Sequence, residues 1–141
     1  MTGEERGSIA PLVVGFTVIL ATLVGVAVDA SAAFLRRQQL DSIADAAALA
    51  ATDGVQGEAL YTAGVGDRLD IDPAVAARYA AQSIRESGAR GRYPGLTFVV
   101  RTSDDRVVVT VRAPLHVPLP VPGVEGSVVS GTAASVVAVE Q

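Results

Sequence analysis

The chain has 141 residues, about the size of one domain, and carries 11 arginines, no lysine and 15 acidic residues, for a net charge of −4 at pH 7. It has no cysteine and a single histidine, His116. These counts exclude disulfide-stapled and iron–sulfur proteins, thiol enzymes, cysteine-ligated zinc sites and histidine-rich metal or relay sites.

The first predicted element is an apolar helix that is long enough to cross a membrane. Residues from Ile9 to Val28 form an uncharged run of 20 residues. At about 1.5 Å per residue this run spans roughly 30 Å, the thickness of the hydrocarbon core of a bilayer. Pro11 falls in the first turn, where a proline does not break a helix.

A cleaved secretory signal is the alternative interpretation of this run, with Ala30–Ala32 as the cleavage site and a soluble secreted product. The apolar run is longer than a usual signal core, and the leader has one arginine against two glutamates, so a retained anchor is favoured. One arginine, Arg6, precedes the span and two, Arg36 and Arg37, follow it. This difference weakly favours a cytoplasmic carboxyl end.

The apolar span is predicted to continue into a stalk, giving one transmembrane and stalk helix over residues 8–52. Strong helix formers follow Val28, and neither glycine nor proline occurs again until Gly54. Such a helix is about 65 Å long. Most of its second half is alanine, and small residues let helix backbones approach closely, so we expect the stalk to pack against neighbouring helices.

Two charged residues of the stalk are candidates for setting the register between subunits. Asp29 and Arg36 are seven residues apart and fall nearly on one stripe of the helix. Because helical side chains lean toward the amino end, Arg36 could reach back to Asp29 or across to another subunit. The alternative is that both residues only mark the boundary with water. Further positions predicted at the subunit contact are Leu40, Ala44, Asp45 and Ala48.

The amino-terminal third of the chain resembles a known family. Arg6-Gly7, the apolar span, Val28-Asp29 and the run from Ala44 to Ala51 together resemble the start of the TadE/TadG-like proteins of tight-adherence, or Flp-type, pilus assembly systems. The resemblance implies a pilin-like protein of the cytoplasmic membrane with a single span. It also implies that residues 1–7 are a cytoplasmic leader and that the carboxyl domain lies outside, in the envelope or in a surface pilus.

The resemblance implies partners and a processing site as well. The partners are the membrane, other pilin-like subunits, the pilus platform, a secretion ATPase and a prepilin peptidase. The peptidase would cut between Gly7 and Ser8. Cleaved members carry a glutamate five residues after the cut, where this chain has Leu12, so a cleaved and an uncleaved form both stay open.

A small α+β domain is predicted over residues 73–141, after a linker. Residues 53–72 hold four glycines and no sustained periodicity, which is typical of a linker. Asp72 and Pro73 form an N-cap and a first-turn proline, and Gly88 is a stop signal, so one amphipathic helix is predicted between them.

Three antiparallel strands are predicted to follow as a meander against this helix. Two segments alternate apolar and polar residues, Leu96–Arg101 and Arg106–Arg112, and residues 103–105 between them have turn composition. A third strand is predicted over 127–139, with Gly131 as a bulge or a point of close packing.

A proline-rich segment separates the second and third predicted strands. Proline occupies every second position from Pro118 to Pro122, which favours an extended, polyproline-like geometry. One interpretation is a docking strip that displays side chains to a partner, and the other is a loop folded over its own sheet. The displayed residues would be Val117, Leu119 and Val121.

No motif for chemistry emerges from the sequence. Asp67, Asp70 and Asp72 lack the spacing of a calcium-binding loop, and no serine–histidine–aspartate or paired-carboxylate pattern is found. Net negative charge and the lack of lysine disfavour a nucleic-acid surface. We therefore predict a structural component rather than an enzyme, with no cofactor, no metal and no nucleic-acid partner. The alternative function is a membrane-anchored, monomeric adhesion or binding module.

Overall fold

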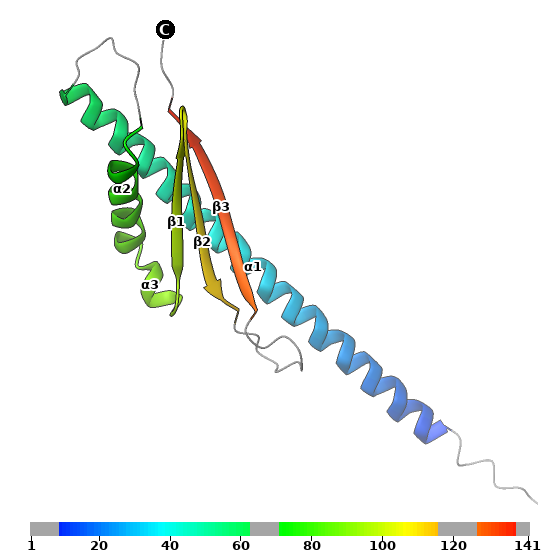
Figure 1. Cartoon of the computed structure of the whole chain (residues 1–141). Helices are drawn as coiled ribbons and strands as arrows, with labels where there is room; N and C mark the ends of the chain where they lie inside the picture. The colour runs from blue at the N-terminus through cyan, green and yellow to red at the C-terminus, as the bar shows by residue number, and fades with distance from the viewer. Residues whose placement is uncertain (1–8, 63–70, 116–126, 138–141) are drawn as a thin grey trace, which may run out of the picture.

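The computed structural model describes residues 9–62, 71–115 and 127–137, and it has the predicted α+β class (Figure 1). A long apolar helix is followed by a small domain, called the head below, with a three-stranded antiparallel sheet and short helices. The elements are α1 (Ile9–Thr62), α2 (Pro73–Glu86), α3 (Ala89–Arg92), β1 (Thr97–Ser103), β2 (Arg106–Pro114) and β3 (Val128–Val136).

Helix α1 continues past its predicted end at residue 52 and occupies the first part of the predicted linker, up to Thr62. Packing against α2 explains this difference. Val55 is buried, and Gly54 lies so close to the ring of Tyr79 that any side chain at residue 54 would overlap the ring. Because the contact with α2 requires a glycine, Gly54 sits inside the helix despite its poor intrinsic propensity.

Helix α2 begins and ends where the sequence predicts. The Asp72 carboxylate accepts hydrogen bonds from the backbone N–H groups of Ala74 at 2.8 Å and Val75 at 3.4 Å, as an N-cap does. Ser87 forms the C-cap, and Gly88 follows with φ +66°, a left-handed conformation that suits glycine. The short helix α3, which the sequence analysis did not predict, comes next.

The strands form one antiparallel sheet in the order β1-β2-β3, and Asp104 and Asp105 make the turn between β1 and β2. One face is buried and the other faces solvent, as the period-two alternation predicts. The fully buried positions lie on the central strand and are Val107, Val109, Val111 and Ala113.

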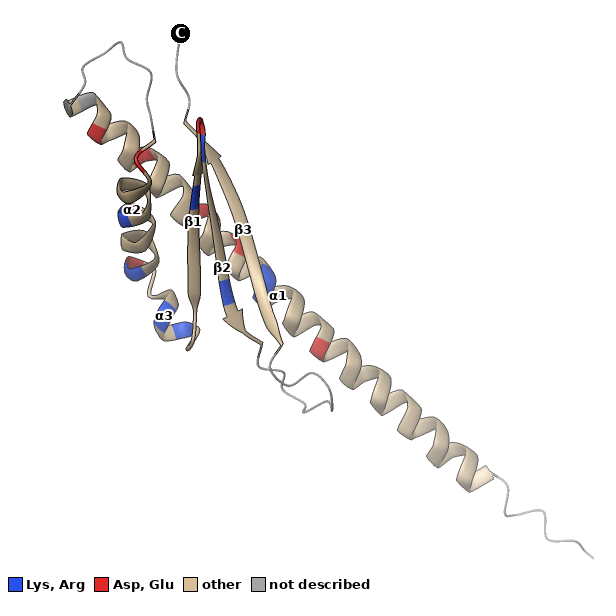
Figure 2. Ribbon diagram, in the orientation of Figure 1, with Lys and Arg blue, Asp and Glu red and all other residues tan. Residues whose placement is uncertain are grey.

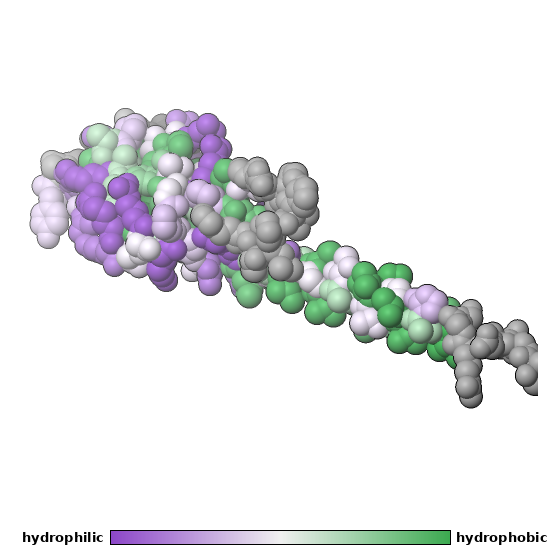
Figure 3. Space-filling model, turned by 90° about the horizontal axis from the view of Figure 1, so that it is seen from below, coloured by the Kyte–Doolittle hydropathy of each residue, from purple (hydrophilic) through white to green (hydrophobic). Residues whose placement is uncertain are grey.

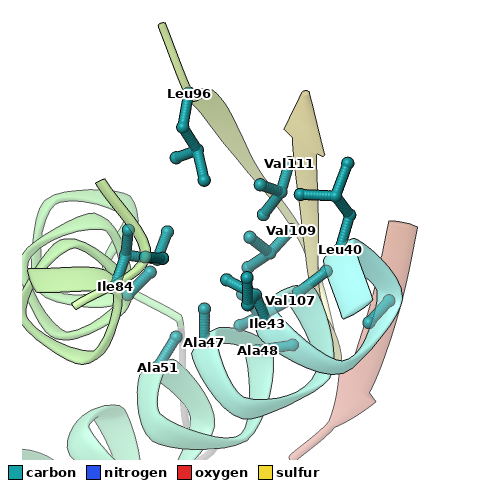
Figure 4. Close-up of a cluster of buried hydrophobic side chains, with 14 of the residues drawn as sticks. Leu40, Ile43, Ala47, Ala48, Ala51, Ile84, Leu96, Val107, Val109 and Val111 are labelled. Carbon is teal, nitrogen blue, oxygen red and sulfur yellow. The ribbon is translucent and has the colours of Figure 1, made fainter. Parts of the chain in front are cut away.

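Helices α1 and α2 cover this buried face, so the head has two layers (Figure 1). Figure 4 shows how the side chains of α1 point between the sheet and α2. The α1 side chains in this core are small or medium-sized, which brings the helix axis close to the sheet. They are Leu40, Ile43, Ala44, Ala47, Ala48, Ala51 and Val55, and the main α2 contribution is Ile84.

Gly131 is a point of close packing, one of the two roles predicted for it. The ladder between β2 and β3 runs through it without a bulge, with Val111 opposite. A Cβ at residue 131 would lie 2.7 Å from the carbonyl oxygen of Leu40, so only glycine lets the α1 backbone approach β3 this closely.

We predict that Gly131→Ala lowers the free energy of unfolding by about 1–3 kcal/mol, because the added methyl group forces the α1 and β3 backbones apart. The matched control is Gly91→Ala, where a Cβ meets nothing within 4 Å. Thermal unfolding of the full chain in detergent micelles, followed by circular dichroism, compares the two variants. Equal stability of the two would contradict the close contact.

Candidate functional site

The first half of α1 projects from the head (Figure 1). The large apolar side chains between Ile9 and Leu35 are 50% to 72% exposed. Figure 3 shows this half as a hydrophobic rod beside a more hydrophilic head. Within the described residues, α1 is the one helix that is long and apolar enough to cross a membrane. An apolar surface of this extent requires lipid or other helices around it.

The polar groups of the projecting half are satisfied within the helix, with one exception. The hydroxyls of Thr17, Thr22 and Ser31 each donate to the carbonyl four residues earlier, at 2.8 Å, which suits a helix in lipid. The exception is Asp29, the one charged side chain between Ile9 and Leu35. Figure 2 shows this single acidic position on an otherwise uncharged rod.

The projecting half meets the head at Arg36. The Arg36 guanidinium lies over the ring of Tyr93, 5.2 Å from its centroid, and the Tyr93 hydroxyl donates a hydrogen bond to the Gln39 side chain. Among the described residues no ion pair joins Arg36 to Asp29, and the one ion pair present is Arg78–Glu58 at 2.7 Å. Asp29 Oδ1 and Arg36 Nε are both buried without a hydrogen-bond partner.

Comparison with known proteins finds a match for the amino-terminal part of the chain. Residues 7–58 match the Tad family of TadE/G-like proteins of Flp pilus assembly. The predicted resemblance is confirmed, and the match extends beyond residue 51, as helix α1 also does. No curated protein and no solved structure matches the chain. The Tad match and the candidate membrane helix fit a membrane-anchored component of pilus assembly.

Three of the residues predicted to pack subunits have a different environment. These residues are Leu40, Ala44 and Ala48. All three lie within residues 7–58, are at most 1% exposed and fill the core of their own chain. The small-residue pattern is explained by this contact with the sheet, so these side chains are not available to a neighbouring subunit. Asp45, by contrast, is exposed.

Several predicted sites lie outside the described residues. They are the processing site at Gly7 and Ser8 and the docking strip with Val117, Leu119 and Val121. Of the three aspartates weighed as a calcium site, Asp72 acts as the N-cap of α2, and the other two also lie outside the described residues.

Asp41, which also lies within residues 7–58, makes a contact with β3 that the sequence does not predict. Its carboxylate accepts a hydrogen bond from the backbone N–H of Thr132 at 3.2 Å. Because β3 is an edge strand, this contact occupies an N–H group that would otherwise be open to pairing with another chain. The two residues are 91 positions apart, and nothing in the local pattern indicates that they meet.

We predict that Asp41→Ala lowers the free energy of unfolding by about 1 kcal/mol more than Asp45→Ala does, because only Asp41 bonds to the sheet edge. Both substitutions change helix propensity equally, so the difference between them isolates the hydrogen bond. Chemical unfolding of the full chain in micelles measures it. Two variants of equal stability would show that the hydrogen bond contributes nothing.

Proposed function

We propose that this protein is a structural, pilin-like subunit of a tight-adherence pilus or secretion assembly. The observation that carries the proposal is the projecting half of α1, which exposes its large apolar side chains and continues without a break into the core of the head. Lipid surrounds this half before assembly, and the same half of neighbouring subunits surrounds it afterwards.

The amino end lies in the cytoplasm and the head lies outside, an orientation supported by the family match and not by the arginine count. Other pilin-like subunits, the membrane platform and the secretion ATPase are its partners in this proposal. A prepilin peptidase that cuts between Gly7 and Ser8 would be a further partner, and N-terminal mass analysis separates a chain beginning at Met1 from one beginning at Ser8.

Packing between projecting halves depends on close backbone approach, because lipid tails are as apolar as leucine and give no hydrophobic driving force between helices. Ala21 and Gly25 form a small-xxx-small pair that allows such an approach. Gly15, six residues before Ala21, has open space where its side chain would be.

Asp29 and Arg36 set the register in this proposal. Each has a buried polar atom that has no hydrogen-bond partner among the described residues. Their spacing of seven residues corresponds to about 10 Å along the helix. A neighbour shifted axially by that amount brings its Asp29 beside Arg36, and the two opposite charges then satisfy each other away from water.

The test reads subunit contact by disulfide crosslinking in intact cells. The chain has no cysteine, so the paired substitution Ala21→Cys and Val28→Cys is a probe without background, and its two positions are seven residues apart, like Asp29 and Arg36. The proposal predicts ladders of crosslinked subunits from this probe. The control is the paired substitution Ala44→Cys and Ala51→Cys, whose side chains are buried in the head and should give none.

On this background, Asp29→Arg or Arg36→Asp should each reduce the ladders about tenfold or more, because two like charges would then face each other at the contact. The double exchange should restore them in part. Undiminished ladders in the single variants would remove the register role. A probe that crosslinks nothing in wild-type cells would instead favour the monomeric anchored module.

A further inference from the structure

A hollow opens where α3 meets α1, at the end of the head nearer the projecting half. Its lining includes two arginines and a phenol, and none of its lining side chains is acidic. The lining residues are Ala32, Leu35, Arg36, Gln39, Arg92 and Tyr93. Figure 2 shows basic residues of α1 and α3 at this end of the head, whereas the hairpin turn at the other end is acidic.

The guanidinium groups of Arg36 and Arg92 have N–H donors that are available to a ligand. A guanidinium offers five N–H donors in a planar fork. The flat face of the Arg36 guanidinium lies over the Tyr93 ring. Arg36 Nε has no hydrogen-bond acceptor among the described residues. Arg92 donates to the carbonyl of Ser87 at 2.8 Å and is otherwise exposed. A ligand with several anionic oxygens, such as a phosphate, is the complementary chemistry.

The height of the hollow above the apolar span indicates the source of that phosphate. With the span ending at Val28, Ala32 lies about 6 Å and Arg36 about 12 Å beyond the hydrocarbon core. The headgroup layer is about 5–8 Å deep. Because helical side chains lean toward the amino end, we place the Arg36 guanidinium at the outer boundary of that layer. Ala32 and Leu35 give the lower side of the hollow an apolar wall.

We infer that this hollow binds the phosphate of an acidic phospholipid. Two arginines side by side repel the cationic end of a zwitterionic headgroup, and an acidic lipid has no such group. The inference rests on the membrane anchor of the proposed function but not on subunit packing. It adds a step to that function: Arg36 holds a lipid phosphate while the subunit is in the bilayer and exchanges it for the Asp29 carboxylate of a neighbour on assembly.

The experiment uses the full chain in nanodiscs of phosphatidylcholine with a minor share of phosphatidylglycerol. Native mass spectrometry then measures the ratio of the two lipids that stay bound to the protein. Wild type should be enriched in phosphatidylglycerol. Arg92→Gln should lower the enrichment roughly tenfold, because one charge-assisted contact is lost. The matched control is Arg101→Gln, which removes the same charge from the exposed face of β1 and should leave the enrichment unchanged.

Two results would overturn the inference, namely no enrichment in wild type or an equal loss in both variants. Inorganic phosphate titrated into nanodiscs of phosphatidylcholine alone supplies a third test through the Arg36 Nε–H resonance. Saturation there at low concentration would assign the hollow to soluble phosphate instead. If Arg92→Gln unfolds at a lower temperature than the control, Arg36→Gln replaces it for the lipid enrichment alone, because Arg36 also belongs to the proposed subunit contact.

The outcome is separable from that of the proposed function. Arg92 lies on α3 rather than on the projecting half, so Arg92→Gln should leave the ladders of the Ala21→Cys, Val28→Cys probe unchanged. Loss of lipid enrichment with intact ladders supports the lipid site alone. Intact enrichment in wild type without ladders would preserve the lipid site and contradict subunit packing.

Discussion

The structure depends on the close approach of the α1 backbone to β3, which Gly131 permits. Through this contact the alanine-rich half of α1 lies flat on the sheet and supplies much of the apolar core. Aromatic residues make up only 4% of the chain, so the head has few large side chains with which to fill a wider gap. Alanine side chains on α1 and a glycine on β3 let the two backbones pack at high density.

Helix α1 is both the candidate membrane anchor and part of the core of the head. Its two halves therefore have different surroundings. From Leu40 to Val55 its inner face is occupied by the sheet and α2, whereas from Ile9 to Leu35 its large apolar side chains are exposed. Force applied to the projecting half therefore passes directly into the core of the head, without a hinge. Arg36, stacked on Tyr93, marks the division between the two parts.

Features that arise from local pattern could be predicted from the sequence. The apolar span, the Asp72 N-cap and the period-two strand around Val109 each follow from residues near one another. The helix end could not be predicted, because Gly54 has low helix propensity and is retained by a contact with Tyr79 that only the fold creates.

The candidate site shows the same distinction. A stripe of small residues predicts that something packs closely, but it does not distinguish a neighbouring helix from the sheet of the same chain. The sequence predicts Ala44 and Ala48 at a contact between subunits, whereas in the structure both side chains lie in the core of their own chain. The contacts of Arg36 with Tyr93 and of Asp41 with Thr132 join residues far apart in sequence, and neither has a local signature.

The most direct test of this account is whether the head folds without α1. Residues 71–141 alone should give a collapsed or unfolded chain without cooperative thermal unfolding and with poor dispersion of amide resonances, because the inner layer of the core is missing. Residues 36–141, which restore the packed part of α1, should fold cooperatively. A cooperative, well-dispersed domain from residues 71–141 would contradict the claim that the stalk helix is part of the core.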